Sequence, residues 1–252
     1  MDATIDTTED VIRYEKVCKS FGDKVVLEDL DLTVKRGETL AIMGPSGIGK
    51  SVTLQHAVGL LKADAGHVKV EGHDMATIGR HDLRDLRRRM GYLFQDGALI
   101  NWLSAGENVA LPLRENTRLS DAEIRERVEE KLETVHLPGT YDLMPPELSG
   151  GMRKRVGLAR ALITEPEIVF FDEPNTGLDP EISMSINHLM RELNEKLSIT
   201  SIVITHLVSC ILVVADRVVL LDQGHVVAEG SPEDFVRSSH PRIRSFLAKP
   251  HD

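Results

Sequence analysis

Eight residues near the start of the chain have the types and the spacing needed to hold a nucleotide phosphate. Residues 44–51 read GPSGIGKS, which fits the pattern G-x-x-x-x-G-K-[ST] in full, between an apolar run and a helical pattern. Glycines let the backbone wrap closely around phosphate oxygens, and the start of a helix favours an anion. The sequence therefore predicts a phosphate-binding loop that consists of Gly44, Pro45, Ser46, Gly47, Ile48, Gly49, Lys50 and Ser51.

Three residues at the end of this loop have specific predicted effects. Lys50 would contact the β- and γ-phosphates of the nucleotide, and Ser51 would give its hydroxyl to Mg²⁺. Val52 stands where many such loops carry a threonine, so only its backbone N–H remains near the α-phosphate. We expect this difference to tune nucleotide binding and not to abolish it.

Two adjacent carboxylates follow a buried strand and supply the second half of a hydrolytic site. Four apolar residues at 168–171 deliver Asp172 at the carboxyl end of the strand, where ligands bind in open α/β sheets. Asp172 would hold Mg²⁺ directly or through water. Glu173 points the other way if the strand continues, and it would polarise the attacking water as a general base.

A second run of small residues opens a later helix. Residues 148–152 read LSGGM and continue as RKRVGLAR, so Ser149, Gly150 and Gly151 lie at a helix N-terminus that favours an anion. This stretch resembles the signature motif of ATP-binding cassette (ABC) ATPases. The resemblance implies a head-to-tail homodimer, in which the signature of one subunit closes over ATP held by the other.

The resemblance covers roughly residues 11–232 and assigns roles to four more positions. Phe21 matches the aromatic residue that stacks on adenine, although a core phenylalanine is an alternative reading. Gln95 matches the glutamine that senses Mg²⁺ and the γ-phosphate, and His206 matches the histidine on the γ-phosphate. Asp179 matches the aspartate that communicates across the dimer, while Leu207 replaces an acidic residue of the family. The implied catalytic residues are Glu173, His206 and Gln95, and the implied metal contacts are Ser51, Gln95 and Asp172.

Hydrophobic periodicity predicts the elements that must position these residues. Strands are expected at 11–17, 25–34, 39–43, 67–71, 168–171, 202–204, 218–221 and 226–228. Helices are expected from residue 50, at 82–89, at 120–135 with a Ser120–Glu123 capping box, at 156–163, and after Pro180 and Ser231. Strands that alternate with helices indicate an α/β fold with a mainly parallel sheet.

The same resemblance implies the P-loop NTPase fold of ABC ATPases, with a RecA-like core. The N-terminal strands predict an antiparallel β subdomain, and the stretch from about 96 to 160 predicts a helical subdomain that carries the signature. The expected limits are 11–235 for the ATPase domain and 236–252 for a short C-terminal tail.

Composition limits the possible partners and compartments. The 252 residues carry 40 acidic and 30 basic side chains, and a net charge of −10 argues against a nucleic-acid partner. Cys18 and Cys210 form no CxxC pattern, so we expect two buried thiols in a reducing compartment. The acidic N-terminus does not resemble a signal peptide, and no run approaches the roughly 18 apolar residues of a membrane span. We therefore expect a cytosolic chain, or one held at a membrane by a partner.

Three classes of ABC protein are compatible with these motifs. DNA-repair ATPases insert a long coiled coil before the signature, and translation factors carry two cassettes, but this chain has room for neither. The ATPase subunit of a membrane transporter is left. Residues 96–112 read DGALINWLSAGENVALP, a loop-like stretch in which Trp102 and its apolar neighbours either pack in the core or anchor a helix of the membrane subunit.

Three longer stretches resemble the Mla/MCE-type phospholipid transport ATPases. They are FQDGALINWLSAGENVALPLRE, ELSGGMRKRVGLARAL and the HPRIRSFL of residues 240–247. The resemblance implies phospholipid transport across the Gram-negative envelope, with this subunit peripheral on the cytoplasmic side of the inner membrane. The implied partners are an integral membrane permease, an MCE-domain lipid-binding protein and often a STAS-domain protein. An amino-acid or methionine importer shares every ATP motif and remains the alternative.

Overall fold

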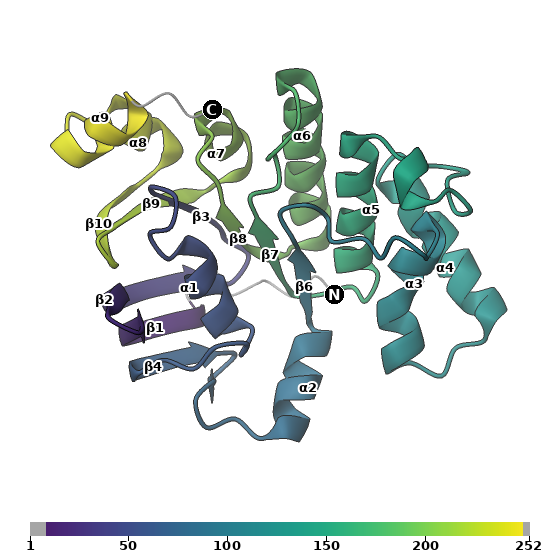
Figure 1. Cartoon of the computed structure of the whole chain (residues 1–252), viewed down its shortest axis with the longest axis horizontal. Coiled ribbons are helices and arrows are strands. Elements are labelled where there is room, and N and C mark those ends of the chain that lie inside the picture. Colours follow the sequence, from purple (N-terminus) through teal and green to yellow (C-terminus); the bar gives the residue numbers. More distant parts are fainter. Residues whose placement is uncertain (1–8, 249–252) are drawn as a thin grey trace.

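The computed structural model describes residues 9–248, which form two β-sheets flanked by helices (Figure 1). The first eight residues, on which part of the signal-peptide expectation rests, and the last four residues of the expected tail lie outside the described residues. Within residues 9–248, no helix is both long and apolar enough to cross a membrane.

The central sheet has six strands in the order β10-β9-β3-β8-β7-β6. Their bounds are β3 (Thr39–Met43), β6 (Met90–Leu93), β7 (Ile168–Asp172), β8 (Thr200–Ile204), β9 (Arg217–Asp222) and β10 (His225–Gly230). Five strands run parallel, and β10 pairs antiparallel with β9. Phe170 and Phe171 in β7 pack into different core clusters on the two faces of the sheet, because helices or strands cover both faces.

A second sheet of four antiparallel strands lies beside the first, in the order β2-β1-β4-β5. Its strands are β1 (Asp10–Phe21), β2 (Lys24–Lys35), β4 (Ala65–Val70) and β5 (His73–Asp74). The predicted α/β fold with an N-terminal antiparallel subdomain is therefore confirmed.

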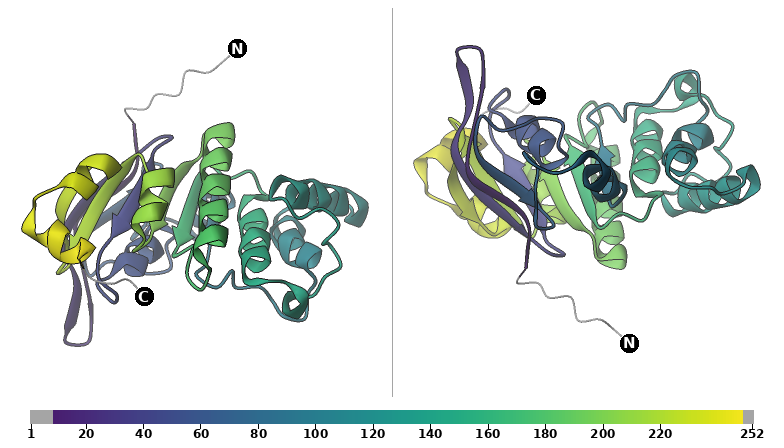
Figure 2. Two further views of the ribbon diagram at one scale, coloured as in Figure 1. Left: turned by 90° about the horizontal axis from the view of Figure 1, so that it is seen from above. Right: turned by 90° about the horizontal axis from the view of Figure 1, so that it is seen from below.

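The helices that contact the central sheet and its edges are α1 (Lys50–Ala57), α2 (Arg80–Arg88), α6 (Pro180–Leu197), α7 (Val208–Val214), α8 (Pro232–Arg237) and α9 (Pro241–Leu247). A helical subdomain contains α3 (Ala105–Asn116), α4 (Asp121–Thr134), the short 3-10 helix η1 (Pro145–Glu147) and α5 (Gly150–Leu162). Figure 2 shows this subdomain at one end of the molecule and α8 and α9 at the other. The predicted capping box is present, because the Ser120 N–H donates to Glu123 Oε2 at 2.8 Å and the Glu123 N–H to Ser120 Oγ at 3.4 Å.

The stretch 96–112, interpreted from sequence as loop-like, contains the beginning of a helix. Helix α3 starts at Ala105 because Ser104 and Glu107 form a second capping box, in which the Glu107 N–H donates to Ser104 Oγ at 3.2 Å. The core-packing alternative for Trp102 is wrong, since this side chain is 79% exposed.

Two further details differ from the expectations. The expected domain limit after residue 235 falls inside α8, and Ile243 and Phe246 of α9 are buried in the same cluster as Phe235. Cys210 is buried, but Cys18 is only partly buried, so the expectation of two buried thiols is wrong for Cys18. Strand β1 is paired on both sides, but Cys18 lies opposite Ala65, the first residue of β4, where the register with both neighbouring strands is irregular.

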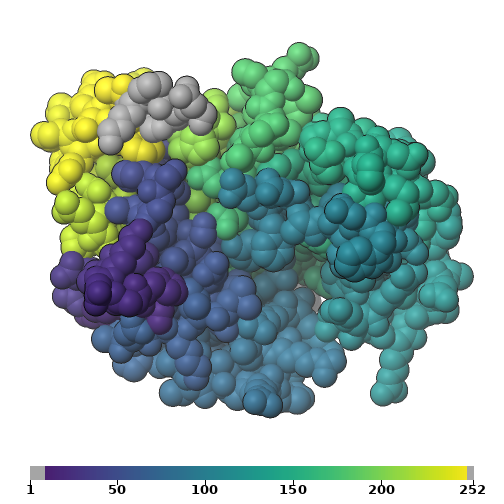
Figure 3. Space-filling view, in the orientation of Figure 1, coloured from purple at the N-terminus to yellow at the C-terminus, as the bar shows by residue number. Residues whose placement is uncertain are grey.

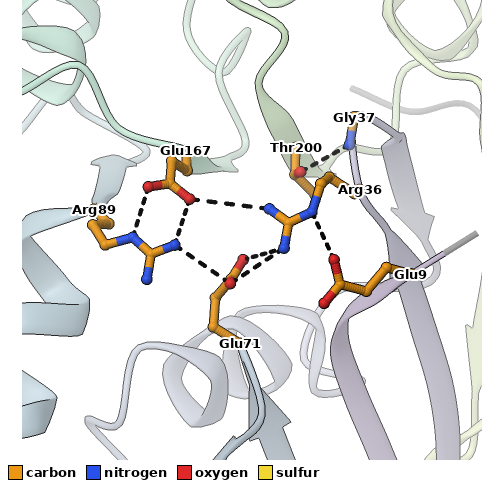
Figure 4. A network of polar contacts seen from close by, with 7 residues as sticks. All are labelled: Glu9, Arg36, Gly37, Glu71, Arg89, Glu167 and Thr200. Atoms are coloured by element: carbon orange, nitrogen blue, oxygen red, sulfur yellow. Dashed lines mark hydrogen bonds and ion pairs between the residues drawn. The ribbon is translucent and has the colours of Figure 1, made fainter. Parts of the chain in front are cut away.

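A network of charged side chains joins the two sheets at the amino ends of β6 and β7 (Figure 4). Glu71, which follows β4, lies 3.2 Å from the guanidinium of Arg36 and 3.4 Å from that of Arg89. Arg89 also pairs with Glu167 before β7, with Nε 2.7 Å from Oε1. The network lies at the opposite ends of these strands from Asp172, so it ties the sheets together away from the predicted nucleotide site.

Candidate nucleotide-binding site

The predicted phosphate loop connects the end of β3 to the start of α1. Gly44 and Gly49 have φ values of 151° and 111°, which favour glycine. A Cβ atom on Gly44 would lie 2.3 Å from the carbonyl oxygen of Leu221, and one on Gly49 would lie 2.8 Å from Cγ1 of Val26. These two glycines are therefore needed both for the shape of the loop and for its close packing.

A cavity of about 640 Å³ opens above this loop. The predicted site residues that line it are Phe21, Ser46, Gly47, Gly49, Lys50, Ser51, Val52, Gln95, Glu173 and His206. They come from the end of β1, the loop and helix after β3, and the segments that follow β6, β7 and β8. The exposed ring of Phe21, 48% accessible, argues against the core alternative for this residue.

The ammonium group of Lys50 is held inside the loop. It donates to the carbonyl oxygens of Gly44 at 2.8 Å and Pro45 at 3.2 Å, and it lies 3.9 Å from Oε1 of Glu173. Burial lowers the pKa of Lys50, and the nearby carboxylates of Glu173 and Asp172 oppose this effect. A positive charge held in a loop of backbone N–H groups suits the binding of phosphate.

Asp172 is brought together with Ser51 across 121 residues of sequence. The Ser51 hydroxyl donates to Oδ1 of Asp172 at 3.0 Å, and the Tyr92 hydroxyl donates to Oδ2 at 3.0 Å. Among the described residues no cluster of three or more His, Cys, Asp or Glu side chains forms a metal site. Ser51 and Asp172 nevertheless fit Mg²⁺, which binds proteins through one or two side-chain oxygens and takes its other ligands from phosphates and water.

Glu173 was expected to point away from Asp172 if the strand continued to this residue. The strand does not continue to Glu173. Strand β7 ends at Asp172, and Glu173 adopts a left-handed conformation with φ of 49°. Its carboxylate therefore turns into the cavity, where Oε2 lies 2.8 Å from Nδ1 of His206. The Glu173 side chain is only 15% exposed, and its carboxylate lies between a lysine and a histidine, which suits a group that accepts a proton.

Lys154 is a buried cation that sequence reasoning missed. It lies on α5 with 4% exposure, and its ammonium donates to the backbone carbonyl of Glu173 at 3.4 Å. Burial lowers its pKa, while Asp96, Glu173 and Asp172 oppose the shift. Helical spacing relative to Gly151 and the apolar residues that follow would have placed Lys154 on the buried face of this helix.

Other residues at the site were also missed. Lys24, Val26 and Thr176 line the cavity, and Tyr92 contacts Asp172. Lys24 pairs with Phe21 across the β1–β2 turn, so the turn residues at Phe21 and Gly22 could have predicted that Lys24 lies beside Phe21. Thr176 and Tyr92 gave no such signal, because their contacts depend on how β6 and β7 are arranged.

Three residues of the predicted loop support the site without lining the cavity. The Gly44 and Pro45 carbonyls accept from Lys50, and Ile48 packs against the core under the antiparallel sheet. Val52 lines the cavity, as its position in the loop predicts. Leu207, the other departure from the family pattern, packs its side chain against the core of the helical subdomain and α6.

The signature residues and Asp179 do not line the cavity of their own chain. Ser149 caps α5 by accepting from the Met152 N–H at 3.2 Å, and Asp179 caps α6 by accepting from two backbone N–H groups at 3.0 Å. A Cβ atom on Gly151 would lie 2.7 Å from Cγ2 of Ile182 in α6. A Cβ atom on Gly150 would lie 3.3 Å from Cδ2 of Leu178, so the signature and the segment before α6 pack on each other within one chain.

The fold and the site together define a P-loop ATPase. The family model described as ABC transporter matches residues 27–176. The chain belongs to this family, whose ATPase fold the solved structures share. One solved structure is the dimeric ATP-binding cassette MJ0796 in a post-hydrolysis state with ADP and Pi. It is 33% identical to this chain, the match covers 88% of this chain and 98% of MJ0796, and the TM-score is 0.79. CbiO1 from Clostridium perfringens, part of the ABC transporter complex cbiONQ, is 30% identical to this chain. The match covers 95% of this chain and 99% of CbiO1, with a TM-score of 0.82.

Relatives of known or assigned role are also similar to this chain over most of its length. The intermembrane phospholipid transport system ATP-binding protein MlaF of Haemophilus influenzae is 43% identical over 95% of this chain and 90% of its own. MlaF of Escherichia coli K12 is 41% identical over 90% of this chain and 84% of its own. The probable ribonucleotide transport ATP-binding protein mkl of Mycobacterium leprae is 40% identical over 94% of this chain and 68% of its own.

Proposed function

We propose that this chain is the ATP-hydrolysing subunit of a membrane transporter that moves phospholipids between the membranes of a Gram-negative envelope. The observation that carries the proposal is the single cavity in which Lys50, Glu173 and His206 meet. A phosphate loop, a carboxylate that follows a buried strand and a histidine that follows the neighbouring strand are the parts that ATP hydrolysis needs.

The proposed reaction assigns a role to each group. Backbone N–H groups of the loop and the ammonium of Lys50 hold the β- and γ-phosphates, and Phe21 stacks on adenine. Ser51, Asp172 and Gln95 would hold Mg²⁺, which neutralises charge on the phosphate oxygens. Glu173 accepts a proton from the water that attacks the γ-phosphate, and His206 orients this carboxylate and contacts the phosphate.

The proposal includes a head-to-tail homodimer. Ser149, Gly150, Gly151 and Asp179 lie outside the cavity of their own chain, so a second subunit is needed if they contact ATP. The similarity to a cassette solved as a dimer supports this arrangement. ATP would then close the dimer, and hydrolysis would reopen it.

Cargo and partners rest on the relatives. Two MlaF proteins match over most of their length, whereas the mycobacterial protein, named for ribonucleotide transport, extends well beyond the match. An integral membrane permease, an MCE-domain lipid-binding protein and a STAS-domain protein are the proposed partners, with this subunit peripheral on the cytoplasmic side of the inner membrane. The exposed Trp102 before α3 supports a contact with the permease. The amino-acid importer alternative gains no support from these relatives.

Reconstitution tests the proposal directly. The chain is co-expressed with a permease and an MCE-domain protein from the same organism, and the purified complex is placed in proteoliposomes that contain fluorescent phosphatidylglycerol. ATP-dependent transfer of the lipid to acceptor vesicles is expected, with no transfer by a Glu173→Gln complex. ATP turnover that responds to an amino acid and its binding protein, without lipid transfer, would instead establish the importer alternative.

A further inference from the structure

The hydroxyl of Tyr92 is a polar group beside the site to which no motif assigns a role. It donates to Oδ2 of Asp172 at 3.0 Å, while the Ser51 hydroxyl donates to Oδ1 of the same carboxylate at 3.0 Å. Rotation of the carboxylate about its Cβ–Cγ bond would lengthen or misalign both hydrogen bonds. The two hydroxyl groups therefore fix the plane of the Asp172 carboxylate.

The register between β6 and β7 explains why Tyr92 reaches Asp172. The strands are parallel, and Tyr92 lies opposite Phe170, two residues before Asp172. Successive side chains in a strand point to opposite faces, so Tyr92, Phe170 and Asp172 lie on the same face of the sheet. The phenol extends along this face from the position of Phe170 to the carboxylate. A phenylalanine in its place would lack the donor to Oδ2.

Apolar contacts hold the ring of Tyr92 in place. Its centroid lies 4.3 Å from that of Phe94 and 6.1 Å from that of Phe170. The ring packs against the core cluster under the antiparallel sheet, which Ile48 and Val52 also contact. Figure 3 shows the segment that follows β6, in blue, on the surface between the core and the helical subdomain, and Phe94 in this segment is exposed. Because the ring is packed between these groups, its hydroxyl points at Asp172 in a fixed direction.

The Asp172 carboxylate keeps acceptor positions for a cation. An ionised carboxylate has about four lone-pair positions on its two oxygens, and the hydroxyl groups of Ser51 and Tyr92 occupy one on each oxygen. The positions that remain suit Mg²⁺ or a water molecule that the ion holds. A carboxylate whose direction is fixed beforehand loses less conformational freedom when the ion binds, so it binds the ion more tightly.

We propose that Tyr92 is a positioning residue for Mg²⁺, and that its hydroxyl holds the Asp172 carboxylate in the direction that binds the ion. The inference rests on the Mg²⁺ contacts of the proposed function and not on its cargo. Tyr92 does not line the cavity, so it acts through Asp172. Removal of a group that hydrogen-bonds a metal ligand typically weakens metal affinity or activity by about 10–100-fold.

Tyr92→Phe tests this role, because it removes the hydroxyl and keeps the ring. The full-length chain is saturated with a non-hydrolysable ATP analogue, and Mn²⁺ replaces Mg²⁺ because the EPR signal of free Mn²⁺ gives the dissociation constant of the ion. We expect Tyr92→Phe to bind Mn²⁺ about ten-fold more weakly than the wild type, with unchanged affinity for the analogue in EDTA. Tyr14→Phe is the matched control, since its buried hydroxyl donates to the Thr53 carbonyl at 2.8 Å outside the cavity lining. The control should bind Mn²⁺ as the wild type does.

A double-mutant cycle shows whether Tyr92 acts through Asp172. Asp172→Asn alone should weaken Mn²⁺ binding at least as much as Tyr92→Phe does. In the Asp172→Asn background, Tyr92→Phe should change the Mn²⁺ dissociation constant by less than about two-fold, because the group that it positions is already lost. A further loss of about ten-fold in that background would overturn the proposed route through Asp172.

The Mg²⁺ dependence of ATP hydrolysis supplies a second measurement. Tyr92→Phe should need about ten-fold more Mg²⁺ for half-maximal activity and recover most of the kcat at high Mg²⁺ concentration. Mn²⁺ affinity equal to that of the wild type would overturn the proposal, and a lower melting temperature alone would show a purely structural role. If the wild-type nucleotide complex binds Mn²⁺ no more tightly than the free nucleotide does, the proposed Mg²⁺ contacts fail and the role of Tyr92 fails with them. Failure of lipid transfer alone would leave the role of Tyr92 intact.

Discussion

Nδ1 of His206 lies 2.8 Å from Oε2 of Glu173, although the two residues are 33 positions apart. The contact exists because β7 and β8 are parallel neighbours, so the segments that follow them emerge at the same edge of the sheet. The left-handed backbone of Glu173 completes the contact by turning the carboxylate toward the histidine. The geometry couples the proposed base to the residue proposed to contact the γ-phosphate.

Glu173→Gln removes the proposed base with almost no change in size. We expect steady ATP hydrolysis to fall by at least about 100-fold, since the amide cannot accept a proton from water. ATP binding and ATP-dependent dimerisation should remain, because Lys50 and the loop are untouched. Phosphate release measures turnover, and light scattering with ATP measures the dimer. Near wild-type hydrolysis would show that another residue acts as the base.

Lys50→Ala removes the cation from the phosphate loop. We expect loss of nucleotide binding or of hydrolysis, because the carbonyls of Gly44 and Pro45 then face the phosphates without a positive charge between them. Binding of a fluorescent ATP analogue and phosphate release are the measurements. Lys62→Ala is the control, since Lys62 is exposed and lies outside the cavity lining. Unchanged binding and turnover in Lys50→Ala would refute the assignment of the loop.

Lys154→Met tests a positioning residue that the motifs do not assign. Methionine keeps much of the volume but removes the donor to the Glu173 carbonyl. We expect kcat to fall by about ten-fold or more while the KM for ATP changes little, because a shifted base slows the chemical step. Lys154→Arg should restore part of the kcat. A purely structural role would instead lower the melting temperature and leave the kcat of the folded protein unchanged.

Glu71→Gln tests the ion-pair network that joins the sheets. The substitution removes the charge of one of the two carboxylates that Arg36 and Arg89 share and leaves only Glu167 between them, and we expect a loss of about 1–3 kcal/mol in the free energy of unfolding. Urea denaturation measures the change. Glu9→Gln is the control, because Glu9 is 59% exposed and such pairs contribute about 0–1 kcal/mol. Equal stability of the two variants would mean that the network does not stabilise the contact between the sheets.

The two cysteines should differ in reactivity. Burial raises the pKa of the Cys210 thiol to about 12, so it stays protonated and unreactive near neutral pH. Cys18 is only partly buried in the small sheet. Titration with a thiol reagent at pH 8 should modify one cysteine in the native protein and both in denaturant, and mass spectrometry should place the native modification on Cys18. Rapid native modification of Cys210 would contradict the described packing of α7.

Much of the fold and most of the site followed from the sequence, because their signals are local. The GPSGIGKS loop needs its glycines and lysine at fixed spacing, and a buried apolar strand places Asp172 at its end. Helix α4 was predictable from Ser120 and Glu123, which cap it through neighbouring atoms. The same kind of signal at Ser104 and Glu107 predicts α3, but the glycine and serine residues of this stretch favoured a loop interpretation.

Tertiary structure alone decided which distant side chains meet. Tyr92 contacts Asp172 at 3.0 Å, and Lys154 contacts the Glu173 carbonyl at 3.4 Å. No pattern of residue spacing in the sequence predicts that these segments meet. The direction of Glu173 depends on the residue at which β7 ends, and a periodic pattern cannot specify that turn. Local chemistry is thus set by spacing along the chain, whereas charge, burial and contact across the site are set by packing.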